Sequence, residues 1–449
     1  MPGNHNAQHT LTSYVIEIVN KVFEEARIER FIERKVRVEE DNIIVNGSAK
    51  VRIGKRRIWL LGVGKAAEGM TRSIMGLLGE KVEGGLLVLP KGALTPRFPS
   101  NIKVIHAGHP LPDEDSLRAG EEALKLASSL SERDLLITLV SGGGSALLEK
   151  PMEGIRLGEL RRVTKLLLDS GASIREVNVV RKHLSKIKGG WLAKKAYPAK
   201  VLALLASDVP GDDPSLIASG PTVPDQSTYA EALEILRFYG LAEKVPKSIL
   251  EVLVRGVRGE IPETPKPGDI CFEAVTNIVI ATPAELLSRI AGFTEKIGYT
   301  PYILTSRLEG ESRDVAKTLA SIVLDSIDGK TSIRPPASLL AAGETSVTVR
   351  GGGWGGRNTE LVAWLSKHLY QQKPLAFASV DTDGVDGNTP CAGAWGDHET
   401  WGRILRVFGR KALEHLHQNN TYVLLERVGQ TINTGFTGTN LNSVTIILF

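Results

Sequence analysis

The sequence contains few cysteines and few aromatic residues. Its two cysteines, Cys271 and Cys391, lie too far apart in the chain of 449 residues to form a Cys-x-x-Cys motif. Two cysteines are also too few for a disulfide-stapled scaffold or a four-cysteine zinc site, so we expect a reducing compartment. Aromatic residues make up 5% of the chain and all hydrophobic residues 42%, which predicts a core packed mainly by aliphatic side chains.

The sequence also lacks long hydrophobic runs and a large net charge. No run of about 18 apolar residues occurs, and residues 1–10 carry no basic segment ahead of an apolar one, so we expect neither a membrane span nor a secretory signal. The formal net charge of +4 is far from the dense basic surface of a nucleic-acid-binding protein. These absences predict a cytoplasmic protein that binds neither nucleic acid nor a membrane.

Glycine is in excess, with 46 residues gathered in a few short runs. Between these runs the apolar residues follow two spacings. Leu11–Ala26 has the spacing of an amphipathic helix, and short aliphatic segments that end in glycine, proline or aspartate predict strands. Because helical stretches separate several of these segments, we expect parallel strands with helices on both faces. The predicted strands of this first part are Ile58–Val63, Leu86–Leu89, Lys103–Ile105, Leu135–Val140 and Val201–Ala206.

The stretch Val257–Asp269 is rich in proline, glycine and charge, which is typical of a linker or a surface loop. We therefore expect one domain at residues 1–255 and a second at 270–449. The second is also predicted to be α/β, with strands at Asn277–Ala281, Tyr302–Leu304, Ser338–Ala342, Leu375–Val380 and Val444–Leu448, and helices at Pro283–Ile297 and Asn358–Leu369.

Ligands of open α/β sheets gather beyond the carboxyl ends of the strands, so the turns after the predicted strands are where we look for chemistry. In Gly62–Ala67 (GVGKAA), backbone amides and Lys65 would face an anion at a helix start. The glycine spacing fits neither the Gly-x-Gly-x-x-Gly dinucleotide motif nor Walker A. A tight turn with a solvated lysine is the alternative interpretation.

A second turn, Ser141–Ser145, places three glycines between two hydroxyls. Gly142, Gly143 and Gly144 allow successive amides to form a concave nest for phosphate oxygens, and the serines add rotatable donors. The alternative is a flexible loop without a ligand.

Two acidic turns follow other predicted strands. In the first, Asp208, Asp212 and Asp213 offer carboxylates of the kind that hold Mg²⁺, and Asx-turns or helix capping are the competing explanation for Asp212 and Asp213. Asp208 is the better candidate because it lies nearest the strand. The second, Asp381–Gly387, lacks the full calcium-loop pattern, which leaves metal assistance, hydrogen bonds to a polyol or plain turn chemistry.

Arg357 follows a run of five glycines around Trp354 and precedes a predicted helix. A guanidinium held there would present a planar fork of donors to a carboxylate or a phosphate. The alternative is a disordered glycine loop. Two weaker candidates are His109, in a loop with two prolines, and the basic residues around Val180–Gly190, which form either a solvated face or a positive wall.

Nine motifs in order make the chain similar to a known family. It resembles the glycerate 2-kinase family, whose C-terminal half carries the MOFRL domain. The matching segments are GVGKAA at Gly62–Ala67, AGHPLPDEDS at Ala107–Ser116, SGGGSALL at Ser141–Leu148, VRKHLSKIKGG at Val180–Gly190, SDVPGDDPSLIASGPTVPD at Ser207–Asp225, AGETSVTV at Ala342–Val349, GGRN at Gly355–Asn358, DTDGVDG at Asp381–Gly387 and TGTN at Thr437–Asn440.

This resemblance implies a Rossmann-like N-terminal three-layer sandwich with a mainly parallel sheet, a C-terminal α/β domain of the MOFRL type, and an active site in the cleft between them. It also implies transfer of the γ-phosphoryl group of ATP to the 2-hydroxyl of (R)-glycerate, giving 2-phosphoglycerate and ADP. In the family the proposed catalytic pair is a lysine and an arginine, which match Lys65 and Arg357 here.

The remaining site residues are hypotheses built on this reaction. We expect Ser141, Gly142, Gly143, Gly144 and Ser145 to hold the phosphates of ATP, and Mg²⁺ or another divalent cation to bind Asp208 or Asp212. A homodimer is the oligomer we consider. The residues expected at the substrate or in the cleft are His109, Arg181, Lys188, Glu344, Asn358 and Asp386.

The sequence departs from the family pattern at Trp191, Cys391 and Phe436. Two alternative functions stay open. An NAD(P)H-dependent hydroxypyruvate reductase would act on the keto form of glycerate, but it needs a dinucleotide turn that the sequence does not offer. A sensor of phosphorylated metabolites would explain the glycine turns but not a lysine and an arginine serving one site.

Overall fold

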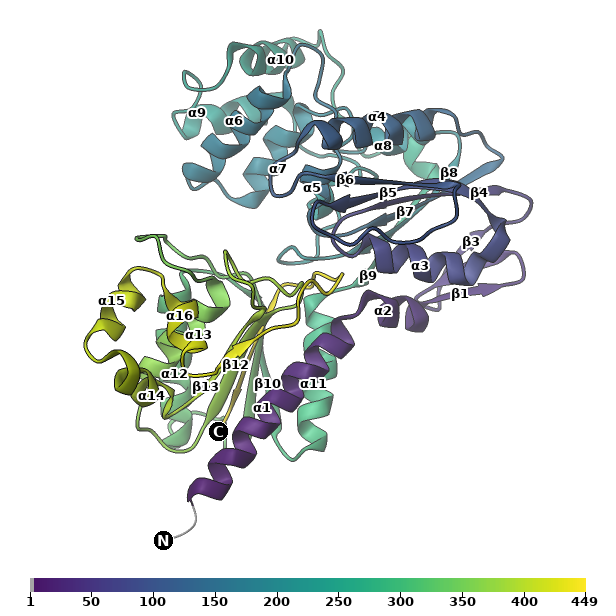
Figure 1. Ribbon diagram of the computed structural model, residues 1–449. Helices are drawn as coiled ribbons and strands as arrows, with labels where there is room; N and C mark the ends of the chain where they lie inside the picture. Colours follow the sequence, from purple (N-terminus) through teal and green to yellow (C-terminus); the bar gives the residue numbers. More distant parts are fainter. Residues whose placement is uncertain (1–3) are drawn as a thin grey trace. The chain divides into compact units, whose positions relative to one another are not determined.

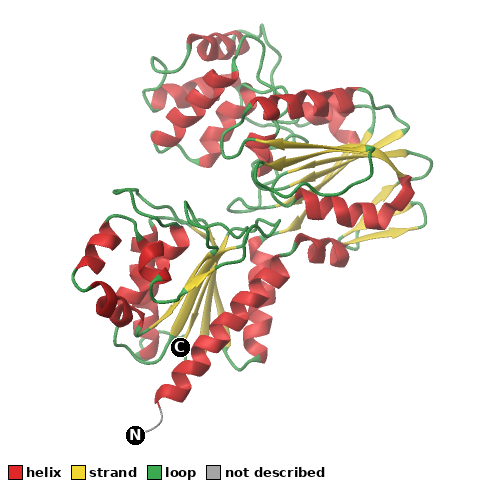
Figure 2. Cartoon of the chain, viewed as in Figure 1, coloured by secondary structure: helices red, strands yellow, loops and turns green. Residues whose placement is uncertain are grey.

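The computed structural model describes residues 4–449, which divide into two compact units. The N-terminal unit is Ile28–Ile280, and the C-terminal unit combines Ala281–Phe449 with the described residues up to Arg27. In each unit a sheet lies between layers of helices, as the yellow strands and red helices of Figure 2 show. The predicted α/β class is confirmed.

A six-stranded sheet forms the centre of the N-terminal unit, in the order β6-β5-β4-β7-β8-β9. The pairs from β6 to β8 are parallel, and every residue of β7 is buried, as expected for a strand that is covered on both faces. The strands are β4 (Arg57–Val63), β5 (Val82–Pro90), β6 (Ile102–Ala107), β7 (Asp134–Val140), β8 (Lys200–Ala206) and β9 (Val275–Ala281).

Helices cover both faces of this sheet. In Figure 1, α3 (Ala67–Leu78) lies on one face, and α4 (Glu114–Ser128) with α8 (Trp191–Ala196) lies on the other. Helix α4 turns Ala119, Ala123 and Ala127 toward the sheet, so one stripe at a spacing of four residues brings the helix close to its aliphatic strands. The core is aliphatic, as the low aromatic content predicts.

The N-terminal unit contains further elements besides the large sheet and the helices that cover it. Four helices share an aliphatic core of their own, and a short helix precedes a three-stranded antiparallel sheet. The helices of the separate core are α6 (Leu157–Asp169), α7 (Ile174–His183), α9 (Tyr229–Phe238) and α10 (Lys247–Val257); the others are α2 (Ile28–Lys35), β1 (Val36–Glu39), β2 (Asn42–Val45), β3 (Ala49–Arg52), α5 (Gly144–Leu147), η1 (Gly79–Lys81), η2 (Ile217–Ser219) and η3 (Ile270–Ala274).

The C-terminal unit has a mixed sheet in the order β10-β11-β15-β12-β13-β14, in which only β10 and β11 pair in parallel. Helices α1 and α11 cover one face, and α12 and α13 the other (Figure 1). Within residues 4–449, no helix has the length and apolar character of a membrane span. The elements are α1 (Asn4–Ala26), α11 (Pro283–Lys296), β10 (Thr300–Leu308), α12 (Ser312–Ile327), β11 (Ala337–Gly343), α13 (Arg357–His368), β12 (Ala376–Asp381), β13 (Gly393–Asp397), α14 (Thr400–Phe408), α15 (Lys411–His417), α16 (Thr421–Glu426), β14 (Thr431–Ile432) and β15 (Ser443–Leu448).

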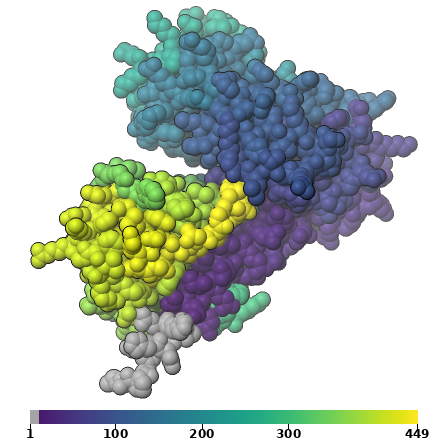
Figure 3. Space-filling model, in the orientation of Figure 1, coloured from purple at the N-terminus to yellow at the C-terminus, as the bar shows by residue number. Residues whose placement is uncertain are grey.

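The N-terminal helix belongs to the C-terminal unit. The predicted amphipathic helix exists, and its residues Val15, Ile18 and Val22 are fully buried. Its last residue is tied to the far end of the chain, because Thr439 Oγ1 donates to the Ala26 carbonyl at 2.8 Å. Figure 3 shows the purple N-terminal residues beside yellow C-terminal ones. The unit boundary therefore falls after Arg27, a position that local composition does not reveal.

The expected linker is an ordered part of the N-terminal unit. Thr264 Oγ1 donates to Asp225 Oδ2 at 3.0 Å, and Glu263 Oε1 accepts from the Tyr229 amide at 2.9 Å. The strand that follows, β9, joins the N-terminal sheet and not the second one. The compact units thus differ from the expected domains 1–255 and 270–449, because side chains of this polar segment bond to buried groups.

Candidate active site

The turns after β4 and β7 are joined by hydrogen bonds. The two strands pair in parallel up to Val63 and Val140, so their turns begin side by side. The Lys65 amide donates to the Gly142 carbonyl at 2.9 Å, and the Ala66 amide donates to Ser141 Oγ at 3.0 Å. These bonds fix the backbone that carries Lys65, so the expected lysine turn and glycine turn form one structure.

His109 and Lys65 lie against Gly143. A Cβ atom placed on Gly143 would lie 3.0 Å from His109 Cδ2 and 3.7 Å from Lys65 Cγ. Gly143 also has a φ of 86°, which favours glycine. Three expected site residues from three different turns therefore come together in the N-terminal unit. In the described part of the chain, the Gly142 and Gly143 amides donate to no other group, which leaves them for an anion.

Ser145 belongs to a polar chain that the sequence did not indicate. Its Oγ lies 2.8 Å from Ser219 Oγ, which in turn donates to Asn178 Oδ1 at 2.7 Å. Ser219 and its neighbour Ala218 both have positive φ, a strained backbone for residues with a Cβ. The segment that follows β8 therefore contacts the glycine turn through Ser219, a residue whose backbone is strained. We call the turns at 64–66 and 141–145, with His109 and Ser219, the turn cluster.

Arg181 and Lys188 have different surroundings. Burial lowers the pKa of the Arg181 guanidinium, and the charge of Glu149 offsets only part of this effect. Among the described residues, no carboxylate forms an ion pair with Arg181. Lys188 is 1% exposed and its ammonium bonds to Glu149 and to the Leu148 carbonyl, so its position argues against the expected contact with substrate.

Asp208 and Asp212 lie in the turn after β8. The Asp212 amide donates to the Val209 carbonyl at 3.1 Å, and this tight turn gives Asp212 a φ of 56°. Its Oδ1 atom is buried and accepts no hydrogen bond from the described residues. No cluster of three or more histidine, cysteine, aspartate or glutamate side chains forms a metal site in that part of the chain. A cation here would rely on one or two carboxylates and on oxygens of other molecules.

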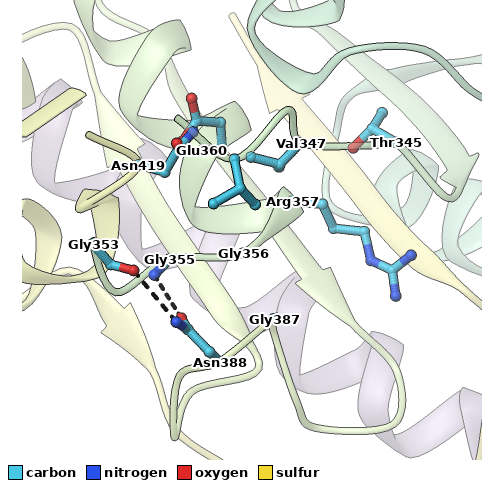
Figure 4. Close-up of a pocket in the computed structure, with 11 residues that line it drawn as sticks. Thr345, Val347, Gly353, Gly355, Gly356, Arg357, Glu360, Gly387, Asn388 and Asn419 are labelled. Atoms are coloured by element: carbon cyan, nitrogen blue, oxygen red, sulfur yellow. Dashed lines mark hydrogen bonds between the residues drawn. The ribbon is translucent and has the colours of Figure 1, made fainter. Parts of the chain in front are cut away.

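The glycine run before Arg357 is ordered by asparagine side chains. The Gly355 amide donates to Asn388 Oδ1 at 2.9 Å, and Asn388 Nδ2 donates to the Gly353 carbonyl at 3.3 Å (Figure 4). Asn420 Oδ1 accepts from the Trp354 amide at 3.0 Å. The loop is therefore held in one conformation, and the disordered alternative does not describe it.

Arg357 is the first residue of α13 and is paired with two carboxylates. Its guanidinium lies 2.8 Å from Glu344 Oε2 and 3.0 Å from Asp381 Oδ2. Burial opposes the positive charge, but the two carboxylates outweigh it and hold the pKa of Arg357 above its ordinary range. The sequence predicted that the Arg357 guanidinium binds a substrate anion, but two carboxylates of the protein itself are bound to it.

Asn358 and Asp386 support Arg357 from within the protein. Asp386 is fully buried, and its oxygens accept from the Asn358 amide at 2.9 Å and the Thr359 amide at 2.8 Å. Burial raises the pKa of Asp386, while these amides act in the opposite direction. Asn358 Oδ1 accepts from Ser379 Oγ at 2.6 Å. Both residues anchor the first turn of α13, which differs from the expected contact with a ligand.

A cavity of about 320 Å³ adjoins this turn in the C-terminal unit. Its walls include Val347, Val349 and the glycine loop. Figure 4 shows Glu360 beside Asn419, and the Arg357 side chain extending away from them. Burial raises the pKa of Glu360, whose Oε1 accepts from Trp364 Nε1 at 2.9 Å. The cavity is large enough for a small ligand.

Comparisons with known proteins agree with this architecture. Residues 14–254 match the family described as Domain of unknown function (DUF4147), and residues 337–443 match the MOFRL family. A Pyrococcus horikoshii protein named glycerate 2-kinase is 40% identical over 96% of this chain and 96% of its own length. A Thermotoga maritima protein named D-glycerate 2-kinase is 37% identical over 87% of this chain and 90% of its own length.

The fold is also similar to solved structures. A crystal structure of a Pyrococcus horikoshii protein has a TM-score of 0.79 and 39% identity, covering 96% of this chain and 97% of that one. The crystal structure of the Thermotoga maritima glycerate kinase has a TM-score of 0.83 and 34% identity, covering 98% of this chain and 100% of that one. Because these likenesses extend over both units, the chain belongs to the glycerate 2-kinase family with DUF4147 and MOFRL domains.

Proposed function

We propose that this chain is an ATP-dependent glycerate 2-kinase, which transfers the γ-phosphoryl group of ATP to the 2-hydroxyl of (R)-glycerate and releases ADP and 2-phosphoglycerate. The observation that carries the proposal is the 40% identity, over 96% of the chain, to a protein named glycerate 2-kinase. The local geometry supports the same class of reaction. Phosphoryl transfer needs positive charge and ordered donors more than covalent catalysis, and both units supply them.

In the N-terminal unit we assign the turns at 64–66 and 141–144 to the phosphates of ATP. The Gly142 and Gly143 amides supply neutral donors, and Lys65 supplies a positive charge beside Gly143. Arg181 is desolvated and forms no ion pair among the described residues, so binding an anion would offset part of the cost of its burial. His109 is exposed next to Gly143 and is assigned to substrate contact.

In the C-terminal unit we assign catalysis to Arg357 and orientation to Asn358 and Asp386. Glu344 is 43% exposed, whereas Asp381 is 1% exposed. An incoming phosphoryl or carboxylate group would therefore replace Glu344 more readily than Asp381, which would continue to orient the guanidinium. A bidentate bond from Arg357 to the anion would then neutralise charge that develops in the transition state.

We assign a divalent cation to Asp208 or Asp212, and the Asp212 Oδ1 atom, which is buried without a hydrogen-bond donor in the described region, supports the assignment for Asp212. When bound, Mg²⁺ would neutralise phosphate charge. ATP is the phosphoryl donor in this proposal and glycerate the acceptor. A cytoplasmic location and a homodimer stay predictions, and light scattering of the purified protein tests the second.

One alternative has an observation in its favour. Two Agrobacterium vitis relatives, each 38% identical over 87% of this chain, carry a hydroxypyruvate reductase name that is given provisionally. The strand that comes after the turn following β4 does not support it, because β5 ends at Leu89 and Pro90, where a dinucleotide site needs an acidic residue for the ribose.

A single assay separates the two functions. Purified protein is incubated with (R)-glycerate, MgCl₂ and ATP, or with hydroxypyruvate and NADH. ADP formation that depends on glycerate supports the kinase, and NADH oxidation without ADP formation would replace it with the reductase.

A further inference from the structure

Three side chains connect the turn after β7 to helix α7. Ser145 Oγ lies 2.8 Å from Ser219 Oγ, and Ser219 Oγ donates to Asn178 Oδ1 at 2.7 Å. Ser219 is fully buried and Asn178 is 1% exposed, whereas Ser145 is partly exposed. This series of hydrogen-bonded side chains therefore runs from the buried Asn178 to the Ser145 hydroxyl in the turn cluster.

The direction of the outer hydrogen bond follows from the inner one. A hydroxyl carries one proton, and an amide oxygen can only accept. Because Ser219 gives its proton to Asn178, it can only accept from Ser145, so the Ser145 proton points into the protein. The structure places Asn178 Oδ1, and not the amide nitrogen, 2.7 Å from Ser219 Oγ.

We propose that Asn178 and Ser219 are positioning residues that hold the Ser145 proton inside the protein, so that Ser145 offers a ligand only oxygen lone pairs. Its partner is then an electron-pair acceptor, which is either a substrate hydroxyl or a divalent cation. Ser145 does not donate to a phosphate oxygen, which reverses the donor role expected from the sequence. This inference rests on the proposed function, because that function places the ligands at the turn cluster.

Binding of inorganic phosphate tests the direction of the proton. Ser219→Ala removes the acceptor and frees the Ser145 proton for an anion. We expect Ser219→Ala to tighten phosphate binding about two- to tenfold by calorimetry, which is the effect of one added neutral hydrogen bond. Ser145→Ala is expected to show no such gain, and the double variant should lose the gain entirely. A folding defect would weaken binding and would not depend on Ser145.

Steady-state kinetics identify the partner of Ser145. If it is a substrate hydroxyl, Ser145→Ala raises the KM for glycerate and leaves the Mg²⁺ concentration for half-maximal activity unchanged; if it is a cation, the pattern is reversed. Either result supports the proposal.

The proposal is overturned if phosphate binding is unchanged or weaker in Ser219→Ala, if the gain persists without Ser145, or if neither wild type nor variant binds phosphate. A wild-type enzyme that does not phosphorylate glycerate would contradict the proposed function alone, because the phosphate titration requires no turnover.

Discussion

The two arginines at the expected sites, Arg181 and Arg357, are both partly buried but have opposite surroundings. Arg357 is paired with Glu344 and Asp381, whereas Arg181 forms no ion pair in the part of the chain that the structure describes. Glu149, which attracts Arg181, bonds to Lys188 instead. Arg181 can therefore bind an anion directly. Arg357 must first release a carboxylate before it can bind one. The N-terminal unit is therefore expected to bind phosphate by itself, and the C-terminal unit only in exchange for Glu344.

The largest effect is expected when the positive charge of Lys65 is removed from the turn cluster. Lys65→Ala is expected to lower kcat on the order of 10²- to 10⁵-fold, because the transferring phosphoryl group loses a charged donor. Initial rates of ADP formation measure it. Lys195→Ala, an exposed lysine of α8, is the matched control and should keep the wild-type rate. A Lys65→Ala enzyme that folds normally and turns over like the wild type would remove Lys65 from the mechanism.

The two arginines should differ in their effect on stability. Arg357→Ala is expected to lower the free energy of unfolding by about 3 kcal/mol, because the buried Asp381 carboxylate loses its counter-ion. Arg181→Ala should leave it unchanged or raise it by up to about 1 kcal/mol, since a desolvated charge without an ion pair costs stability. Urea denaturation of both variants measures the difference. Arg181→Ala should also raise the KM for ATP, and equal destabilisation of both variants would contradict the comparison.

The strands were predictable because continuous aliphatic runs such as Leu135–Val140 occur where a strand is buried on both faces. The unit boundaries were not, because α1 and the segment around Thr264 are assigned by contacts with residues far along the chain. The same limit applies to the site. The turns that carry Lys65 and Arg357 are marked by local glycines, but composition does not show which distant side chains they contact.

The partners that the sequence analysis missed are mostly asparagines and serines. Asn178 and Ser219 are separated by 41 residues, and Asn388 lies 33 residues after Gly355. No spacing rule connects such pairs. A weak signal exists for Asn388, which follows the acidic turn Asp381–Gly387, but the same residue type is common in ordinary turns.

The pH dependence of stability gives a smaller contrast between the units. In the N-terminal unit, burial of Asp113 opposes its charge, but Lys91 and the Ser116 amide lower its pKa to about 2. Its stabilising contribution is present above its ordinary pKa of 3.8 and is lost as the pH falls through 2. In the C-terminal unit, burial raises the pKa of Asp386. The stability that its protonated carboxyl contributes to the folded state is therefore lost as the pH rises.

Asp113→Asn tests this contrast. It is expected to remove at most about 2 kcal/mol at pH 5 and almost nothing at pH 2, as measured by chemical denaturation at both values. Asp113 also caps α4, because its side chain accepts from the Ser116 amide. A loss of equal size at the two pH values would show that this cap, and not the charge of Asp113, is responsible.

The smallest effect is expected at the loop before Arg357. Asn388→Ala removes one hydrogen bond to Gly353 and one to Gly355, which should cost about 1 kcal/mol and speed tryptic cleavage after Arg350. The exposed Asn433→Ala is the control and should be cut at the wild-type rate. Asn419 Oδ1 accepts from the Arg350 amide at 2.7 Å. Unchanged cleavage in Asn388→Ala would mean that Asn419 and Asn420 hold the loop without Asn388.

The most direct test of the account is the identity of the phosphorylated product. Wild-type enzyme is incubated with (R)-glycerate, ATP and MgCl₂, and the product is identified by ³¹P NMR through the coupling of phosphorus to the carbon-bound protons. We predict 2-phosphoglycerate, formed in a one-to-one ratio with ADP. Formation of 3-phosphoglycerate, or hydrolysis of ATP without a phosphorylated glycerate, would contradict assignment of the chain as a glycerate 2-kinase.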